Sequence, residues 1–244
     1  MKTRYVQNVK VLSSMTDAKA EMGLAHTLSY LQDNMCEFFK ALGCDGITMI
    51  PIAKCFWVMT KTKVKFNSTV KWMDNIVLET GLSKKTSARL NIYNNILDTS
   101  GNMIVEGMQE ICAVDSETRK LRLVSTTALP EDIEVDEDKI PTTNFTKFEE
   151  ELDESYLRKN YIVDSRSIDF FGHTNNVEYA RIMFSTFTGI EVNSLVPREF
   201  EIHYIAESRE GDNLLVYRKD DGDSHYFEIK CGERVISKAL LVVD

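Results

Sequence analysis

The residues best suited to chemistry in this sequence stand in one short string, IDFFGHTNNVEY, at residues 168–179. Asp169 precedes His173 by four residues, and Glu207 follows further along the chain in a segment that reads as a strand. A carboxylate can act as a general base or as a nucleophile, and an imidazole can orient or polarise a reacting group. The string therefore predicts an active site in the second half of the chain, where a strand gives way to a helix.

Each of these residues also has a simpler explanation when it is taken alone. An Asp before a helix is commonly a cap, a His is often a structural imidazole, and a Glu on a strand usually faces solvent. Their joint occurrence with Gly172, Asn175 and Asn176 favours catalysis. We expect the backbone amides near Gly172 to be unpaired at the helix start and to offer donors to an anion, with Asn176 holding that start.

This string resembles the signature of the hot-dog thioesterases, in which an Asp, a His four residues later and an Asn-Asn pair lead into a central helix. The length, the two similar halves and residues 26–43 resemble the double hot-dog acyl-acyl carrier protein (acyl-ACP) thioesterases of plant plastids and bacteria, over nearly the whole chain. The resemblance implies hydrolysis of a fatty acyl-ACP thioester, which releases free fatty acid and ends fatty acid synthesis. It implies that Asp169, His173 and Glu207 are catalytic.

The chemistry of a thioester fits these residue types. Its thiolate leaves readily, so the reaction needs an activated water or a carboxylate nucleophile together with donors for the oxyanion. No metal or cofactor is expected. Either Asp169 or Glu207 can be the base or nucleophile, and His173 would orient or polarise the thioester and water.

Two positions depart from the plant members of the family. They have an Asn two residues after the Asp, whereas this sequence has Phe171, which offers no amide side chain. Single-domain relatives that act on coenzyme A thioesters often carry Asp-x-Phe-Gly-His, so the resemblance leaves Phe171 compatible with activity. Ser208 stands where many plant members have Cys, and the exchange leaves carboxylate chemistry intact.

The elements that must position these residues follow from the hydrophobic periodicity. Apolar residues recur at helical spacing over residues 26–42, with Gly43 as a stop, and a second helix is predicted over 175–187. Strand-like segments in the first half are residues 55–66, 75–83, 86–98 and 103–115. Those in the second half are 161–168, 200–208, 213–219, 224–231 and 234–243. Each half thus predicts one long helix wrapped by an antiparallel sheet.

The two halves show a weak internal repeat. His26-Thr27 is matched with His173-Thr174, and residues 72–75 resemble residues 210–213. In this alignment Met22 stands opposite Asp169 and Thr69 opposite Glu207, so both carboxylates are missing from the first half. We therefore expect that half to be a non-catalytic acyl-chain pocket, as the resemblance also implies. Its candidate lining residues are Phe38, Phe39, Trp57 and Met59, although such residues are more often plain core.

The predicted fold is α+β, with two tandem hot-dog domains. We place the N-terminal hot-dog domain at residues 1–129, an acidic linker at 130–156 and the catalytic C-terminal hot-dog domain at 157–244. Residues 130–156 read as a linker because they are polar and acidic, with few large apolar residues.

The composition and charge of the chain limit which partners and which location are expected. A formal net charge of −9 argues against nucleic acid, and the chain has no apolar stretch of about 18 residues for a membrane span. The N-terminus lacks a signal-peptide pattern, so a cytoplasmic location is expected. The five cysteines lack metal-ligand spacing and read as reduced core thiols. Fused hot-dog domains already form the pairing that single-domain relatives make between chains, so the protein is expected to be a monomer or a homodimer.

Acyl carrier protein is the expected partner. Because carrier proteins are acidic, docking needs a local cationic patch on this chain. The sequence offers three candidate sets: Lys54, Lys61, Lys63, Lys65 and Lys71; then Lys84, Lys85 and Arg89; then Lys159, Arg166 and Arg209. The first set is equally explained as an ordinary outer strand face.

Three alternatives stay open. The first is an acyl-CoA thioesterase, which the motif of single-domain relatives supports. The second, a hot-dog dehydratase or hydratase, is disfavoured because those enzymes place the His five residues after the Asp, with a Pro between them. The third is a non-catalytic acyl-binding hot-dog module, which would release no thiol.

Overall fold

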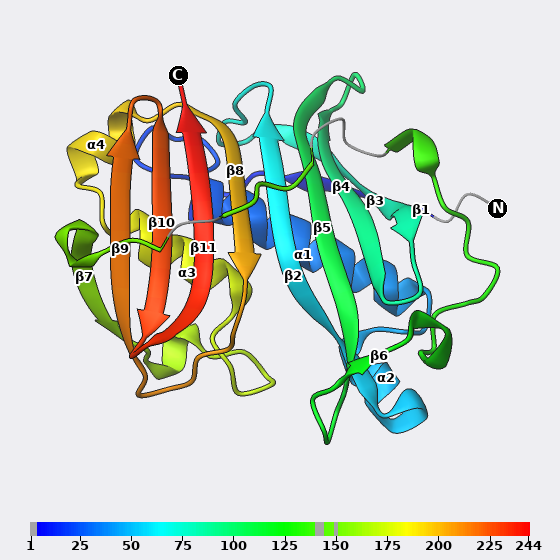
Figure 1. The fold of residues 1–244 in the computed structure, drawn as a ribbon. Helices are drawn as coiled ribbons and strands as arrows, with labels where there is room; N and C mark the ends of the chain where they lie inside the picture. Colours follow the sequence, from blue (N-terminus) through cyan, green and yellow to red (C-terminus); the bar gives the residue numbers. More distant parts are fainter. Residues whose placement is uncertain (1–3, 140–143, 149–150) are drawn as a thin grey trace. The chain divides into compact units, whose positions relative to one another are not determined.

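In the computed structural model, residues 4–139, 144–148 and 151–244 are described, and the chain divides into two compact units (Figure 1). The first unit comprises residues 1–144 and the second residues 145–244. The boundary therefore falls inside the segment 130–156 that the sequence suggests as a linker. Each unit pairs a curved antiparallel sheet with a helix.

The first unit is built on a sheet of long strands in the order β1-β3-β4-β5-β2, with β6 paired to β5. All of these pairs are antiparallel. The strands are β1 (Arg4–Lys10), β2 (Cys55–Phe66), β3 (Asn75–Lys85), β4 (Arg89–Asp98), β5 (Met103–Asp115) and β6 (Leu121–Arg122). The predicted strands 55–66 and 103–115 are confirmed at both ends.

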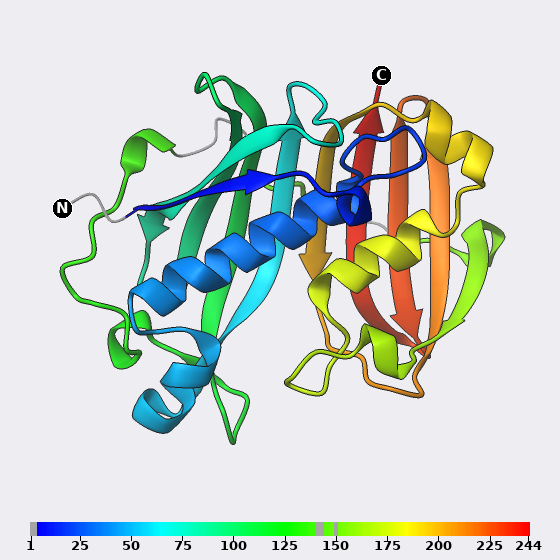
Figure 2. The same ribbon diagram turned by 180° about the vertical axis from the view of Figure 1, so that it is seen from behind.

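Helix α1 (Leu24–Ala41) lies across one face of this sheet (Figure 2). Its buried stripe includes Leu28, Leu31, Met35 and Phe38, at the spacing that predicted the helix. The chain leaves the helix through Gly43, whose φ of +72° lies in the left-handed region that glycine adopts without strain. The predicted helix and its stop are thus confirmed, with a start two residues earlier.

A second helix of this unit, α2 (Gly46–Ala53), was not predicted from the sequence. Its sequence GITMIPIA is apolar on nearly every side, so it carries no periodic stripe. Asp45 caps it by accepting hydrogen bonds from the backbone N–H groups of Ile47 and Thr48. Among the described residues, no helix is long and apolar enough to cross a bilayer.

The second unit has a sheet in the order β8-β11-β10-β9-β7, with antiparallel neighbours throughout. Its strands are β7 (Leu157–Ile162), β8 (Pro197–Tyr204), β9 (Asn213–Asp221), β10 (Ser224–Cys231) and β11 (Arg234–Val243). Helix α3 (Asn176–Phe184) lies against this sheet, and the short α4 (Gly189–Ser194) follows it (Figure 2). The predicted strands 224–231 and 234–243 are confirmed.

Several boundaries in this unit differ from the sequence prediction, and three of them affect the candidate site. The first strand ends at Ile162, because a 3₁₀ turn over Ser165–Ser167 replaces its predicted end. Helix α3 ends at Phe184, three residues before the predicted end. Strand β8 ends at Tyr204. The backbone N–H groups of Ile205 and Ala206 both donate to the Ile236 carbonyl, so the regular hydrogen-bond pattern between β8 and β11 stops there. Glu207 consequently lies in a loop rather than on a strand.

Candidate active site

The Asp169 side chain organises the turn that precedes α3. Its Oδ1 accepts hydrogen bonds from the backbone N–H of Phe171 at 2.8 Å and of His173 at 3.3 Å. The main chain closes the same turn, because the Gly172 N–H donates to the Asp169 carbonyl and the Asp169 N–H to the His173 carbonyl. Gly172 has a φ of +77°, which glycine accepts without strain. The turn therefore fixes the backbone that carries His173.

The His173 ring faces the Glu207 carboxylate. Its Nε2 lies 3.1 Å from Glu207 Oε2, and the two side chains are 12% and 41% exposed. The Arg209 guanidinium lies 3.4 Å from the same Nε2. A shielded imidazole thus contacts a carboxylate that remains open to water. His173 links the three predicted catalytic residues, since its backbone is held by Asp169 and its ring contacts Glu207.

Behind this pair lies a cluster of three buried hydroxyl groups, from Thr174, Tyr179 and Ser208. Ser208 Oγ is 2.7 Å from Thr174 Oγ1 and 2.9 Å from Tyr179 Oη. Tyr179 Oη also accepts the Ser208 backbone N–H at 3.0 Å. Burial raises the pKa of Tyr179 above its ordinary value, and the charge of Glu207 adds to that rise, so the phenol stays neutral.

The backbone amides around Gly172 already have acceptors, contrary to the sequence expectation. Helix α3 begins only at Asn176, so the Gly172 and His173 amides precede it and are used within the turn. The Thr174 amide donates to the Ser208 carbonyl and the Asn175 amide to the Ser167 carbonyl. Among the described hydrogen bonds, the first amide after Phe171 without an acceptor is that of Asn176.

The residue that caps α3 is Asn175, and not Asn176 as predicted. Asn175 has non-helical backbone, with φ of −59° and ψ of 140°, and its side chain accepts the Val177 N–H at 2.9 Å. Both Asn side chains were candidates from the sequence because the pair stands directly at the junction. The one-residue choice depends on where the turn ends, which the spacing alone does not fix.

The first unit contains a second copy of the Asp169 turn. Asp17 Oδ1 accepts the backbone N–H of Lys19 at 2.9 Å and of Glu21 at 3.3 Å. The Ala20 N–H donates to the Asp17 carbonyl and the Asp17 N–H to the Glu21 carbonyl, and Ala20 has a φ of +56°. These bonds repeat those of the Asp169 turn one for one.

The copies also agree in what surrounds them. Helix α1 starts seven residues after Asp17 (17 to 24), and α3 starts seven after Asp169 (169 to 176). The Met22 amide donates to the Val70 carbonyl at 2.8 Å, as the Thr174 amide does to the Ser208 carbonyl at 2.9 Å. In the same way, Asp74 Oδ2 accepts the Lys71 N–H and Asp212 Oδ2 accepts the Arg209 N–H. The predicted likeness of residues 72–75 and 210–213 is confirmed.

The predicted alignment of the two segments that precede the helices is wrong. The sequence suggested that His26 matches His173 and Met22 matches Asp169, whereas Asp17 is the equivalent of Asp169. The shared His-Thr dipeptide was misleading, because His26 lies inside α1 and His173 precedes α3. The N-terminal copy therefore keeps the turn-forming carboxylate that it was expected to lack.

The two copies differ at the positions that face the candidate site. Glu21 stands in place of His173. Thr69 stands in place of Glu207, because each directly precedes the residue whose carbonyl accepts the turn amide. The predicted match of Thr69 with Glu207 is confirmed. An imidazole beside a carboxylate is therefore present in the C-terminal copy and is replaced at both positions in the N-terminal one.

Three of the predicted acyl-pocket residues form an aromatic cluster in the first unit. The rings of Phe39 and Trp57 stack at 5.3 Å, and Phe38 contacts Phe39 at 5.4 Å. Met59 is buried, and its sulfur accepts a hydrogen bond from Thr62 Oγ1 at 3.0 Å. Phe38, Phe39 and Met59 are therefore part of the core, and Trp57 is half-buried at its edge. All five cysteines are free thiols, and in the described part of the chain no three His, Cys, Asp or Glu residues gather as a metal site would require.

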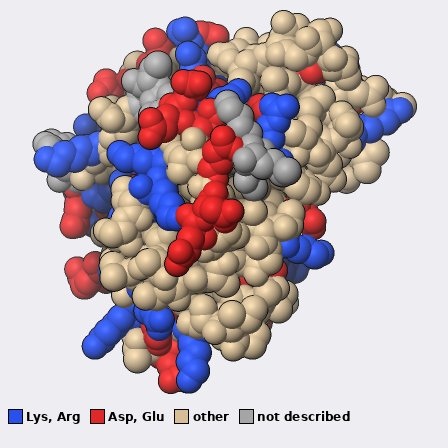
Figure 3. Space-filling model, turned by 90° about the vertical axis from the view of Figure 1, so that its right-hand side faces the viewer, with Lys and Arg blue, Asp and Glu red and all other residues tan. Residues whose placement is uncertain are grey.

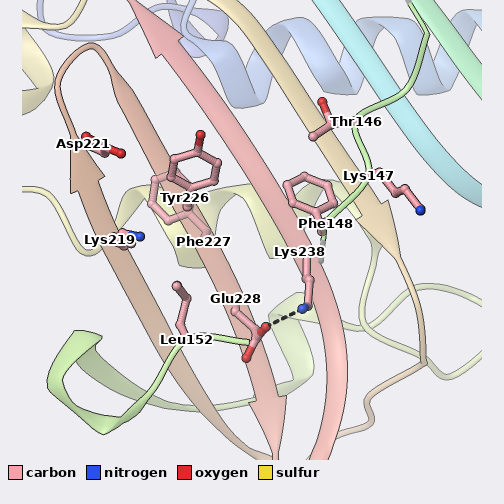
Figure 4. Close-up of a pocket in the computed structure, with 10 residues that line it drawn as sticks. All are labelled: Thr146, Lys147, Phe148, Leu152, Lys219, Asp221, Tyr226, Phe227, Glu228 and Lys238. Atoms are coloured by element: carbon pink, nitrogen blue, oxygen red, sulfur yellow. Dashed lines mark ion pairs between the residues drawn. The ribbon is translucent and has the colours of Figure 1, made fainter. Parts of the chain in front are cut away.

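A pocket of about 360 Å³ lies elsewhere in the second unit, on the side of the sheet away from α3 (Figure 4). Phe148 and Leu152, from the segment before β7, and Tyr226 and the buried Glu228, from β10, are among its lining residues. Lys238 Nζ lies 2.9 Å from the Glu228 carboxylate. None of the three predicted catalytic residues lines this pocket.

Some of the candidate basic residues already form ion pairs or hydrogen bonds with neighbours in their own units. Lys61 lies 3.6 Å from Glu110, while Lys63 is buried and donates to the Asn144 carbonyl. Arg166 is paired with Asp164 at 2.6 Å. On the face shown in Figure 3, acidic and basic side chains are interspersed. The strand-face explanation therefore suits Lys61 and Lys63.

Comparison with known protein families tests the family resemblance that the sequence suggested. Residues 2–130 match the acyl-ACP thioesterase N-terminal domain, and residues 150–237 match the acyl-ACP thioesterase C-terminal domain. The chain belongs to the acyl-ACP thioesterase family. This confirms the predicted enzyme class, a thioester hydrolase that acts on acyl-ACP. Among curated proteins, none matches the sequence significantly.

Solved structures support the fold of this acyl-ACP thioesterase family member. An acyl-ACP thioesterase from Bacteroides thetaiotaomicron is 15% identical, with a TM-score of 0.85 over 99% of this chain and 98% of that one. The 12:0-ACP thioesterase from Umbellularia californica is 16% identical, with a TM-score of 0.83 over 99% of this chain and 97% of that one. At such low identity the likeness concerns the fold, and it confirms the predicted α+β class with two tandem hot-dog domains.

Proposed function

We propose that this acyl-ACP thioesterase releases free fatty acid from fatty acyl-ACP in the cytoplasm and so ends fatty acid synthesis, using His173 and Glu207 of its C-terminal unit. The supporting observation is the contact of 3.1 Å between His173 Nε2 and Glu207 Oε2. The matching turn of the N-terminal unit lacks both groups, since it has Glu21 and Thr69 there. The pair is thus not needed to form the fold.

Glu207 is the proposed general base, because its carboxylate is open to water and is oriented by the His173 ring. It takes a proton from a water whose oxygen attacks the thioester carbonyl carbon. The tetrahedral intermediate collapses with cleavage of the carbon–sulfur bond, and the proton held by Glu207 passes to the leaving sulfur. The products are a carboxylic acid and the carrier thiol.

Asp169 is proposed to position His173 instead of reacting itself. Its Oδ1 is committed to two backbone N–H groups. Asp17 makes the same bonds in a copy that has no imidazole–carboxylate pair. A carboxylate that recurs where no chemistry is expected is best explained by the turn it forms.

Two donors are proposed for the oxyanion. The Asn176 amide stands at the positive end of α3, and the Arg209 guanidinium lies beside His173 Nε2. A guanidinium at this place would compensate for Phe171, which cannot supply the amide that plant members carry. In the N-terminal copy the equivalent of Arg209 is Lys71.

Arg209→Gln should lower kcat about 10-fold with little change in KM, a smaller loss than for a buried oxyanion donor because the guanidinium stays solvated. The measurement is thiol release from acyl-ACP and, in parallel, from a small acyl thioester that has neither a carrier protein nor a phosphate. Arg166→Gln is the matched control, since Arg166 is also exposed and its ion pair is with Asp164. A loss seen only in KM, and only with acyl-ACP, would assign Arg209 to carrier docking.

The N-terminal unit is proposed to receive the acyl chain, with Phe38, Phe39, Trp57 and Met59 as candidate contacts. Its copy of the turn lacks the reactive pair, and its interior is largely apolar. Binding would require these packed side chains to rearrange.

The decisive experiment is thiol release from matched acyl-ACP and acyl-CoA thioesters of several chain lengths. We expect a higher kcat/KM with the carrier-linked substrate, and a steeper loss of rate with added salt because the carrier is acidic. A preference for acyl-CoA with equal salt sensitivity would favour the acyl-CoA thioesterase alternative. Acyl binding without any thiol release would identify a non-catalytic module.

A further inference from the structure

We infer that Tyr179, acting with Ser208 and Thr174, is a positioning residue that holds Glu207 against His173. The inference rests on the proposed function, because it concerns the geometry of the same pair. Nothing in the sequence motif assigns Tyr179 a task, and its hydroxyl does not contact the imidazole or the carboxylate in any described hydrogen bond.

The first part of the argument is the peptide group between Glu207 and Ser208. Its N–H donates to Tyr179 Oη at 3.0 Å, in a buried site. Glu207 lies in a loop beyond the end of β8, so no strand partner fixes this peptide. Tyr179 comes from the first turns of α3, so its hydroxyl ties the loop to the helix that follows His173.

The second part of the argument is the set of hydrogen bonds between Thr174 and Ser208, the residues that follow His173 and Glu207. The Thr174 N–H and Oγ1 both donate to the Ser208 carbonyl, at 2.9 and 3.2 Å. Ser208 Oγ then lies between Thr174 Oγ1 and Tyr179 Oη. His173 and Glu207 are thus each followed by a residue of one buried hydrogen-bonded cluster, which sets their separation.

The N-terminal copy of the turn shows that the fold does not need this cluster. The equivalents of Thr174, Ser208 and Tyr179 are Met22, Val70 and Thr27. The backbone bond from Met22 to Val70 persists at 2.8 Å. Thr27 instead donates its hydroxyl to the carbonyl of Gly23, the N-cap residue of α1. The hydroxyl cluster accompanies His173 and Glu207, and no such cluster is described where those two residues are replaced.

This geometry also fixes what Ser208 can do. Its Oγ is buried and hydrogen-bonded on two sides, so it is not available as a nucleophile. Ser208→Ala removes these two contacts but keeps the amide bond to Tyr179. It should therefore cost less activity than Tyr179→Phe, which removes the acceptor of that amide.

The test is a double-mutant cycle between Tyr179→Phe and Glu207→Gln. Tyr179→Phe should lower kcat by up to about 100-fold with KM nearly unchanged, the scale of loss for a small misplacement of a reacting group. In the Glu207→Gln background it should have almost no further effect, because the group that it positions is already gone. Tyr217→Phe is the matched control, since Tyr217 is a buried tyrosine of the same unit that donates to Glu154 and not to the site.

Each outcome of the cycle either supports or refutes the positioning role of Tyr179. If Tyr179→Phe behaves like Tyr217→Phe, or if its loss multiplies with that of Glu207→Gln, the positioning role is refuted. If Tyr179→Phe unfolds, as thermal melting would reveal, Ser208→Ala and Thr174→Val take its place in the same cycle. The proposed function fails separately, through normal turnover of Glu207→Gln alone or through absence of thiol release by the unaltered protein.

Discussion

Glu207→Gln is expected to lower kcat for thiol release by about 10²–10⁴-fold, the usual contribution of a general base, with KM changed little. The amide has the shape of the carboxylate and can still accept a hydrogen bond from the His173 ring, which lies 3.1 Å from it. What it cannot do is take a proton from water. The loss should therefore appear in the chemical step, with the fold and substrate binding preserved.

Steady-state kinetics on acyl-ACP, with circular dichroism to check the fold, would measure this. Glu210→Gln is a suitable control, because Glu210 is an exposed carboxylate three residues further along the same loop. The control should keep normal turnover. Turnover of Glu207→Gln within a few-fold of normal would remove Glu207 from the mechanism and return Asp169 as the candidate base.

The second large effect is expected from paired substitutions in the duplicated turn, Asp169→Ala and Asp17→Ala. Each removes an acceptor of two backbone N–H groups, so each should lower the free energy of unfolding by about 1–3 kcal/mol. Only Asp169→Ala should also lose activity, by about 100-fold or more, because His173 then leaves its place beside Glu207.

Denaturant unfolding and thiol release, measured on both variants, test this prediction. Asp169→Asn should retain more turnover than Asp169→Ala, since the Asn side chain offers the same oxygen acceptor to the turn. If Asp169→Asn is stable but as inactive as Asp169→Ala, the negative charge of Asp169 takes part in the chemistry. An equal loss of activity in Asp17→Ala would contradict the division of roles between the units.

Much of the sheet could be predicted because its strands are long and bounded by clear turns. Residues 55–66, 103–115, 224–231 and 234–243 matched β2, β5, β10 and β11, since alternation and turn residues mark both ends. Helix α2 could not be predicted, because its apolar sequence has no period. The end of β8 depends on two amides sharing the Ile236 carbonyl, a tertiary feature with no local signal.

At the site, the motif indicated which residues matter but not how they divide the work. The spacing of Asp169 and His173 is the same whether Asp169 reacts or forms a turn. Only the hydrogen bonds to its Oδ1 favour the turn. The likeness of Asp17 to Asp169 was missed because the residues between Asp17 and Met22 share no side chain with those after Asp169. The two turns share their backbone hydrogen bonds although most of their side chains differ, so a comparison of side chains does not reveal the likeness.

The duplicated turn has a consequence for how this chain could have evolved. If both halves descend from one ancestral segment, the Asp-centred turn predates their divergence, because both copies retain its hydrogen bonds. Losing the imidazole and the glutamate from one copy then required no change in architecture. The N-terminal unit stands to the C-terminal one as a pseudoenzyme stands to its active paralogue, with both carried on a single polypeptide.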